Sequence, residues 1–200
     1  RPDAPPGVKG ISLFLVPKFL VNEDGSLGER NDVYAVNLEH KLGIHASPSC
    51  VMAYGDQGGA IGYLIGEEHD GLRCMFTMMN NARLGVGLQG LSVAERAYQQ
   101  AVAFAKERVQ MRDAIRCRRA PGTVIHHPDV RRMLLRMRAQ VEAMRCLAYT
   151  AAAGLDLAKR LPDPEGRKAA QRRVDLLIPI VKAWCTDVGL EVASTNVQVH

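Results

Sequence analysis

The stretch from Gly71 to Arg112 contains no proline, and its apolar side chains recur with the period of an α-helix. The first of them fall at i, i+3, i+4 and i+7, namely Leu72, Met75, Phe76 and Met79. Leucines and then alanines continue the same spacing as far as Phe104. We therefore predict one long helix over residues 69–110, with a kink permitted in its glycine-rich middle.

Two further helices are predicted after this one. Pro128 suits a first helical position, and Asp129 suits the positive end of a helix dipole, so the second helix should span residues 128–160. The sequence LPDPEG at 161–166 ends it. The third helix should run from about 166 to 199, and Pro179 should kink it or mark a late start. Three long helices with short connections imply an antiparallel bundle.

The first 66 residues lack long helical periodicity and consist of short apolar runs separated by turn residues. Short apolar runs at 10–17, 49–56 and 60–68 end at Gly, Pro or Asp, and residues 31–44 hold one or two more strands. Residues 1–7 should be irregular, and residues 22–32 read as a turn-rich excursion around Asp24-Gly25. The predicted fold class is therefore α+β, with a small antiparallel β-domain at 1–66 followed by the helical bundle at 67–200.

Residues 85–90, GVGLQG, spell the G-x-G-x-x-G fingerprint of a dinucleotide-binding turn. That fingerprint works only between a strand and the start of a helix, where free N–H groups meet the pyrophosphate. Here helical periodicity runs on both sides of the glycines. Each glycine costs about 1 kcal/mol inside a helix. We therefore interpret them as a surface that another backbone, or a flat ligand, approaches closely.

The charged residues, cysteines and histidines indicate which partners, redox environment and metal sites the chain is suited to. The formal charge is +5, with basic clusters at 112–122 and 166–175 that suit either nucleic acid and acidic ligands or solvated helix ends. The five cysteines lack paired or metal-like spacing, which favours a reduced, cytoplasmic setting. Cys50 and Cys146 lie in apolar runs and are predicted to be core residues. The adjacent pair His126-His127 is unsuited to chelation, and no metal site is predicted.

No apolar run reaches the roughly 20 residues of a membrane span, and no signal segment opens the chain. The sequence begins at Arg1 without an initiator Met and stops at His200 inside an amphipathic stretch. We expect it to be a piece of a longer protein.

Four stretches, in order, resemble the acyl-CoA dehydrogenase family: HKLGIHASPSCVMAYGD (40–56), GYLIGEEHDGLRCMFTMMNNARLGVGLQG (62–90), AVAFAKERVQMRDAI (101–115) and VASTNVQVH (192–200). The segments MFTMMNNARLGVGLQG and HHPDVRRMLLRMRAQ resemble most closely the sequences of the methylmercaptopropionyl-CoA dehydrogenase-like branch. The resemblance spans nearly the whole chain. It implies the middle β-domain and a truncated C-terminal helical domain of an FAD-dependent enzyme.

The resemblance also implies a reaction. Family members remove a proton from the α-carbon of an acyl-CoA while a hydride leaves the β-carbon for FAD. The base is a carboxylate. Some members carry it immediately before the helix Arg, but that position is Ala82 here. In most members it lies in a later segment, so we expect the base beyond His200 and an inactive isolated fragment.

The resemblance assigns five site residues. Arg83 matches a helix Arg beside the active site, and Asn80 lies on the same face, so both are candidates for substrate binding. Arg108 matches an Arg that reaches the FAD pyrophosphate of the neighbouring subunit, where paired guanidinium donors suit phosphate oxygens. Gln110 matches a position near the adenosine part, and Gln198 matches the Gln that opens an FAD-contacting segment. Purely structural roles remain open for Arg83, Asn80 and Gln198.

The predicted function is α,β-dehydrogenation of an acyl-CoA by the parent protein, with FAD as cofactor and an electron-transfer flavoprotein as electron acceptor. A homodimer or homotetramer is expected. Two alternatives stay open. One is a DNA-binding flavoprotein relative of the same fold, motivated by the basic runs at 116–119 and 167–173. The other is a helical interaction module without catalysis, although nucleic acid and membrane partners are not favoured.

Overall fold

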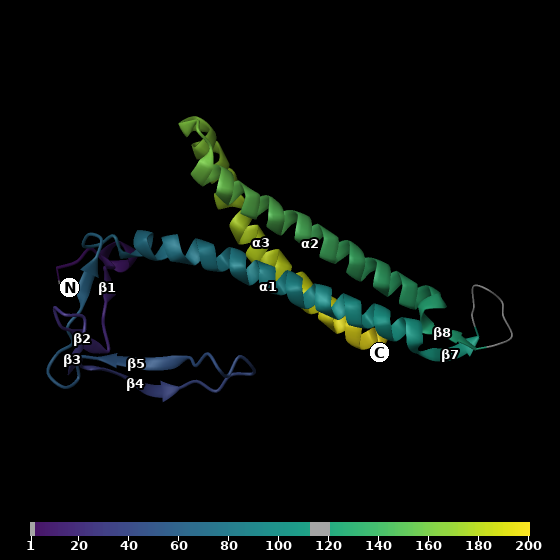
Figure 1. Cartoon of the computed structure of the whole chain (residues 1–200), viewed down its shortest axis with the longest axis horizontal. Helices are drawn as coiled ribbons and strands as arrows, with labels where there is room; N and C mark the ends of the chain where they lie inside the picture. Colours follow the sequence, from purple (N-terminus) through teal and green to yellow (C-terminus); the bar gives the residue numbers. More distant parts are fainter. Residues whose placement is uncertain (1–2, 113–120) are drawn as a thin grey trace. The chain divides into compact units, whose positions relative to one another are not determined.

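The computed structural model describes residues 3–112 and 121–200 (Figure 1). The chain divides into two compact units, with the division after Met78. The first unit holds the strands β1 to β6. The second holds most of α1, a short hairpin, α2 and α3.

The first unit consists of three two-stranded antiparallel ribbons among the described residues. β1 (Leu13–Leu15) pairs with β6 (Tyr63–Ile65), β2 (Phe19–Val21) with β3 (Leu27–Arg30), and β4 (Val33–Leu38) with β5 (Cys50–Tyr54). The antiparallel β-character predicted for this part is confirmed. The strands are shorter than predicted, and a 3-10 helix, η1 (Gly7–Gly10), precedes β1.

The predicted turn-rich excursion at 22–32 is wrong in one respect, because β3 occupies Leu27–Arg30. Asp24-Gly25 makes the turn of the hairpin between β2 and β3, with Gly25 in the left-handed region at a φ of 82°. The Ser26 N–H donates to Asp24 Oδ1 at 2.9 Å, and this turn aligns the strands on either side.

Asn31 is a buried polar residue that joins separate segments of this unit. Its exposed fraction is 5%, and its amide Nδ2 donates to the carbonyls of Pro17 at 2.9 Å and Ile61 at 2.8 Å. Its Oδ1 accepts from the Asp32 and Ile61 N–H groups at 3.0 and 2.9 Å. Both ends of the amide are therefore satisfied, which removes the cost of its burial.

α1 spans Gly71–Glu107 as a single helix, so the predicted helix at 69–110 ends too late. The chain leaves the helix at Arg108 and forms β7 (Val109–Arg112), which pairs with β8 (Pro121–Thr123). A 3-10 turn, η2 (Val124–His126), follows. The predicted loop at 113–127 therefore missed the second strand of a hairpin, and its residues 113–120 lie outside the described residues. Strands this short show no sequence period of their own.

α2 spans Pro128–Arg160, as predicted, and α3 spans Pro164–Val199. α3 begins two residues before the predicted start because Asp163 caps it. The Asp163 carboxylate accepts from the N–H groups of Glu165 at 3.3 Å and Gly166 at 2.7 Å. Pro179 lies inside a continuous helix, so the late start that we considered is wrong.

The three helices bury one common core, in agreement with the predicted bundle (Figure 1). The fully buried side chains of α1 are alanines, whereas those of α2 and α3 are mostly larger. The fully buried members include Ala94, Ala101 and Ala105 from α1, Met137, Val141 and Met144 from α2, and Val181, Cys185 and Val192 from α3. A row of alanines lets the α1 backbone approach the other helices closely.

The glycines of GVGLQG lie inside α1 and make contact with α3. A Cβ on Gly87 would lie 2.5 Å from Val181 Cγ1, and one on Gly90 would lie 2.8 Å from the Cys185 carbonyl carbon. Gly189 returns the contact, because its Cβ would lie 2.9 Å from the Gly90 oxygen. The close-packing interpretation is confirmed for these two glycines of α1. Gly85 differs, since nothing lies within 4 Å of its Cβ position.

The predicted core cysteines are wrong. Cys50 and Cys146 are exposed, whereas Cys185 is buried and Cys74 is half-buried. Cys146 follows Met144 by two residues, a rotation of about 200° around α2 that turns it away from the core. An apolar run in a helix thus crosses both faces. Burial raises the pKa of the Cys185 thiol.

We expect Gly90→Ala to destabilise the bundle by about 1–3 kcal/mol, because its methyl group would meet the α3 backbone. The matched control Gly85→Ala should stabilise α1 by up to about 1 kcal/mol, since the added methyl group meets open space and favours the helix. Urea unfolding followed by circular dichroism at the helix band measures both. Equal stabilisation by the two substitutions would contradict the close contact.

We expect Cys185 to resist alkylation by iodoacetamide in native buffer at pH 8, whereas Cys50 and Cys146 react rapidly. Because the folded pKa of Cys185 is raised, its contribution to stability is complete below the ordinary thiol pKa of about 8.5 and is lost as the pH rises above it. Peptide mapping by mass spectrometry identifies the labelled sites. Native labelling of Cys185 as fast as that of Cys146 would show that the α1–α3 contact is open.

Candidate functional site

Arg108 lies where α1 ends, and backbone bonds hold it on both sides. Its N–H donates to the Phe104 carbonyl at 2.9 Å, and its own carbonyl accepts from the Val124 N–H at 2.8 Å. The side chain is exposed. A guanidinium on a fixed backbone position at the surface is suited to paired contacts with an anionic group.

Gln110 lies in the middle of β7 and not at the end of a helix, which corrects the predicted position. Its side chain is exposed, and its carbonyl oxygen lies 2.9 Å from His127 Nε2. A carbonyl only accepts, so this contact places the imidazole proton on Nε2. The next residue, Met111, has a φ of 61°, a conformation that is uncommon for a residue other than glycine. This residue lies where the β7–β8 register shifts.

Gln198 is exposed on the last turn of α3, at the same end of the bundle as Arg108. A ring contact joins the C-terminal end of α3 to the end of α1. The His200 imidazole stacks on the Phe104 ring with centroids 4.2 Å apart and an interplanar angle of 23°. Phe104 lies one helical turn before Arg108. Figure 1 shows the C-terminus of α3 beside the last turns of α1 and the β7–β8 hairpin. The structure thus brings three of the five predicted site residues to one end of the bundle.

Arg83 and Asn80 form a separate pair on α1. The Arg83 Nη1 donates to Asn80 Oδ1 at 3.3 Å, and both side chains are half-buried. Arg83 precedes Arg108 by 25 residues, a distance of about 37 Å along a helix. The substrate candidates and the cofactor candidates of this chain therefore belong to two different places on the bundle.

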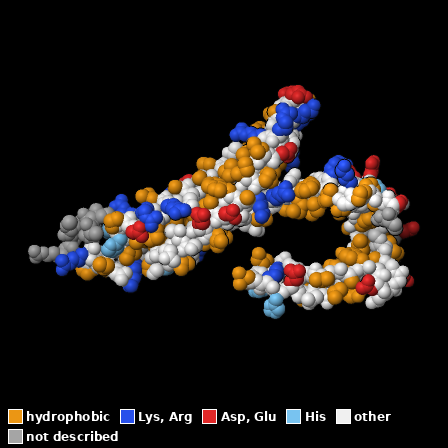
Figure 2. Space-filling model, turned by 180° about the vertical axis from the view of Figure 1, so that it is seen from behind, with side chains coloured by type: hydrophobic (Ala, Val, Ile, Leu, Met, Phe, Trp, Pro, Cys, Tyr) orange, Lys and Arg blue, Asp and Glu red, His pale blue; other side chains and the backbone are white. Residues whose placement is uncertain are grey.

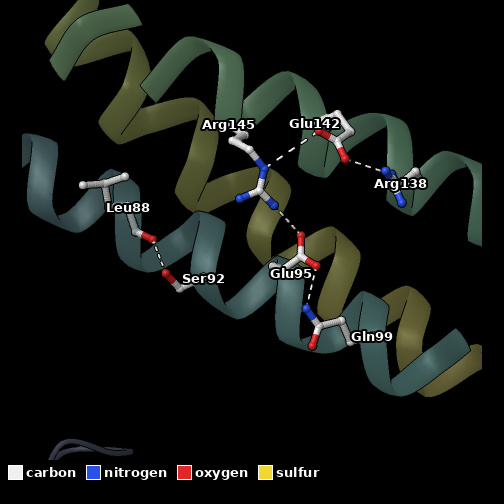
Figure 3. A network of polar contacts seen from close by, with 7 residues as sticks. All are labelled: Leu88, Ser92, Glu95, Gln99, Arg138, Glu142 and Arg145. Carbon is white, nitrogen blue, oxygen red and sulfur yellow. Dashed lines mark hydrogen bonds and ion pairs between the residues drawn. The ribbon is translucent and has the colours of Figure 1, made fainter. Parts of the chain in front are cut away.

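α1 carries carboxylates only at Glu95 and Glu107, and Glu95 is tied to α2. Its Oε2 lies 2.5 Å from Arg145 Nη2, and its Oε1 accepts from Gln99 Nε2 at 2.7 Å (Figure 3). A general base needs a carboxylate oxygen that is free to reach the proton it removes, whereas both oxygens of Glu95 are held by side chains of the bundle. Glu95 is therefore a helix tie and is not suited to act as that base.

The ion pair between Glu95 and Arg145 is part of a polar network that continues along α2. Arg145 Nε lies 3.8 Å from Glu142 Oε2, and Arg138 Nε lies 2.9 Å from Glu142 Oε1 (Figure 3). Hydrogen bonding to Tyr98 and the charge of Glu142 raise the pKa of Arg138. Sequence analysis missed this network. The i,i+4 spacing of Arg138 and Glu142 was a visible signal, but the contact between Glu95 and Arg145 depends on how two helices meet.

Within residues 3–112 and 121–200, no group of three or more His, Cys, Asp and Glu side chains comes together. Across the same residues, no helix is long and apolar enough to cross a membrane. The basic run at 116–119 lies outside the described residues. In the run at 167–173, Arg167 donates to the Leu161 and Pro162 carbonyls, and Lys168 pairs with Glu165 at 2.9 Å.

A family model described as "Acyl-CoA dehydrogenase, C-terminal domain" matches residues 69–200. Over 199 residues the chain is 51% identical to 3-methylmercaptopropionyl-CoA dehydrogenase from Ruegeria pomeroyi, covering 100% of this chain and 33% of that protein. It is 38% identical over 204 residues to a butyryl-CoA dehydrogenase from Syntrophomonas wolfei, covering 100% and 33%. The chain spans about a third of the length of these curated relatives.

Solved structures agree with the fold. Caenorhabditis elegans ACDH-11 in complex with C11-CoA matches with a TM-score of 0.78 and 22% identity, over 96% of this chain and 29% of that one. Butyryl-CoA dehydrogenase from Megasphaera elsdenii matches with a TM-score of 0.69 and 25% identity, over 97% and 42%. The resemblance predicted from the sequence is confirmed. The two alternatives, a DNA-binding relative and a helical interaction module, gain no support from these matches.

We expect a double-mutant cycle on Glu95→Gln and Arg145→Gln to give a coupling energy of about 1–2 kcal/mol, because both side chains are only a quarter to a third exposed. The matched control is the Asp129–Arg132 pair on α2, whose side chains are 71% and 61% exposed. Its coupling should be below about 0.5 kcal/mol. Urea unfolding measures both cycles, and equal couplings would contradict the role of Glu95 as a tie.

Proposed function

The chain belongs to the acyl-CoA dehydrogenase family, and on that premise we propose that it is part of an FAD-dependent enzyme that oxidises an acyl-CoA thioester between its α and β carbons. One observation supports this most directly. Arg108 presents an exposed guanidinium from a backbone position bonded on both sides, at the bundle end that also carries Gln198.

The residues at this end fit a dinucleotide. We propose that Arg108 binds the pyrophosphate of FAD, and that Gln110 and Gln198 supply amide groups to its polar parts. Phosphate oxygens accept paired guanidinium hydrogen bonds, and side-chain amides both donate and accept. FAD, when bound, supplies the acceptor for the hydride from the β-carbon.

The distance between the two clusters constrains how the cofactor is shared. Arg83 and Arg108 lie about 37 Å apart along α1, further than one side of a flavin site requires. We propose that Arg83 and Asn80 serve the substrate of one site, whereas Arg108 reaches the FAD of a neighbouring subunit. A homo-oligomer, a dimer or tetramer, follows from this arrangement.

The proton-abstracting carboxylate is proposed to lie outside residues 1–200. At the alternative position before Arg83 the residue is Ala82, which has no ionisable group, and Glu95 is held by Arg145. The chain alone should then show no dehydrogenase activity. We further propose an electron-transfer flavoprotein as the electron acceptor, a cytoplasmic location, and a boundary between the β-domain and the helical domain at 66/67.

The test uses the parent protein. We expect it to be yellow when purified, and its flavin should bleach when an acyl-CoA such as 3-methylmercaptopropionyl-CoA or butyryl-CoA is added without oxygen. Absorbance of the oxidised flavin measures both results. A colourless parent that does not take up FAD would overturn the proposal.

Variants of the parent test the assigned residue. Arg108→Ala should weaken FAD binding at least tenfold, and Arg108→Lys should restore it only in part, because an ammonium lacks the paired donors. Arg172→Ala, which removes an exposed cation of α3, is the control and should bind FAD normally. Normal FAD binding by Arg108→Ala, measured by flavin fluorescence, would remove Arg108 from the site.

A further inference from the structure

A groove of about 440 Å³ lies between α1, η2 and the first turns of α2. It has an aliphatic floor and a basic rim. The floor is formed by Val102, Ile125, Leu134 and Leu135, and the rim by Tyr98, His126, Arg131 and Arg138. Its volume lies within the range of small-molecule sites, roughly 300–1,000 Å³.

The floor is apolar surface that folding of the described chain leaves open. Leu135 is 68% exposed, and Val102 and Ile125 are half-buried. Figure 2 shows other hydrophobic side chains on the helices, interspersed with lysines and arginines. The groove differs from those scattered residues because its apolar groups converge from three elements on one concave place.

The basic side chains on the rim differ in whether they have interaction partners. Arg138 is occupied, since it pairs with Glu142 at 2.9 Å and lies 5.9 Å from the Tyr98 ring centroid. In the part of the chain that the structure describes, the Arg131 guanidinium and the His126 imidazole have no hydrogen-bond or ion-pair partner. No carboxylate is among the described residues that line the groove. The charge of Arg131 is therefore uncompensated, and Arg131 is the available cation.

We propose that this groove binds a small carboxylate with an alkyl chain, with the carboxylate on Arg131 and the chain along the aliphatic floor. Arg131 precedes Arg138 by two helical turns, about 10 Å along α2, so the cation lies at one end of the floor. A guanidinium pairs with a carboxylate through two parallel hydrogen bonds. Burial of the chain against Val102, Leu134 and Leu135 adds the apolar contribution.

The lining argues against a nucleotide as the occupant. A nucleotide base needs an aromatic face for stacking. Among the described residues of the lining, Tyr98 is the only aromatic ring apart from the imidazole of His126, and it already faces the Arg138 guanidinium. The remaining wall is aliphatic. The site is also distinct from the proposed FAD contacts of Arg108, Gln110 and Gln198, and nothing in the proposal depends on dehydrogenation.

The test is titration of the purified chain with decanoate below its aggregation concentration, followed by isothermal calorimetry. We expect one saturable site, and decanol, which has the same chain without the charge, should bind about tenfold more weakly. Arg131→Gln should weaken decanoate binding about tenfold and leave decanol binding unchanged. Leu135→Ser, which changes an exposed residue of the floor, should weaken both ligands.

The matched control is Arg132→Gln. Arg132 is the next residue on α2, but its guanidinium pairs with Asp129 at 2.8 Å and does not line the groove. It should bind decanoate as the unmodified chain does, and circular dichroism checks that all variants remain helical. The proposal is overturned if decanol binds as tightly as decanoate, if the two arginine variants lose affinity equally, if binding does not saturate, or if AMP binds more tightly than decanoate.

Discussion

The close contact between α1 and α3 is the constraint on which the rest of the bundle depends. Gly87 and Gly90 of α1 meet the α3 backbone near Val181 and Cys185, and Gly189 returns the contact. Helices that meet through glycines come closer than helices separated by side chains, which fixes their axial alignment. From this contact both helices run in the same direction. Their C-terminal ends therefore arrive together, where His200 stacks on Phe104 and Arg108 begins the hairpin.

α2 is placed against this pair by polar contacts as well as by its core residues. Arg145 meets Glu95 of α1, and Arg136 meets Glu191 of α3 at 3.3 Å. Along α2 the arginines then differ in what they do. Arg145 and Arg138 are bound to carboxylates, whereas Arg131 lies on an apolar groove whose described lining residues include none. The same helix thus provides both a structural tie and the cation of a proposed binding site.

The length of α1 sets the separation between the two clusters of candidate residues. A rigid helix carries Asn80 and Arg83 near one end and Arg108 just past the other, so a single ligand does not reach both. This supports a proposal in which the chain serves two sites of an oligomer. The glycine fingerprint between the clusters is unsuited to a phosphate, since its N–H groups lie in a helix and Gly87 and Gly90 pack against α3.

The sequence by itself determined the class of fold and the bounds of the three long helices to within a few residues. Helical periodicity, Pro128 and the 161–166 break were enough to predict α2 to the residue and α3 to within two, because these signals act locally along the chain. The resemblance to the acyl-CoA dehydrogenases was also visible in the sequence. Tertiary structure decided what depends on distant partners: the β7–β8 pairing, the role of Asn31, the exposure of Cys146 and the tie from Glu95 to Arg145. The physical reason is that a contact between distant segments depends on which element lies nearby, and the local sequence does not specify that. Among the glycines of GVGLQG, Gly85 meets open space while Gly87 and Gly90 meet α3, and only the position of the neighbouring helix creates this difference.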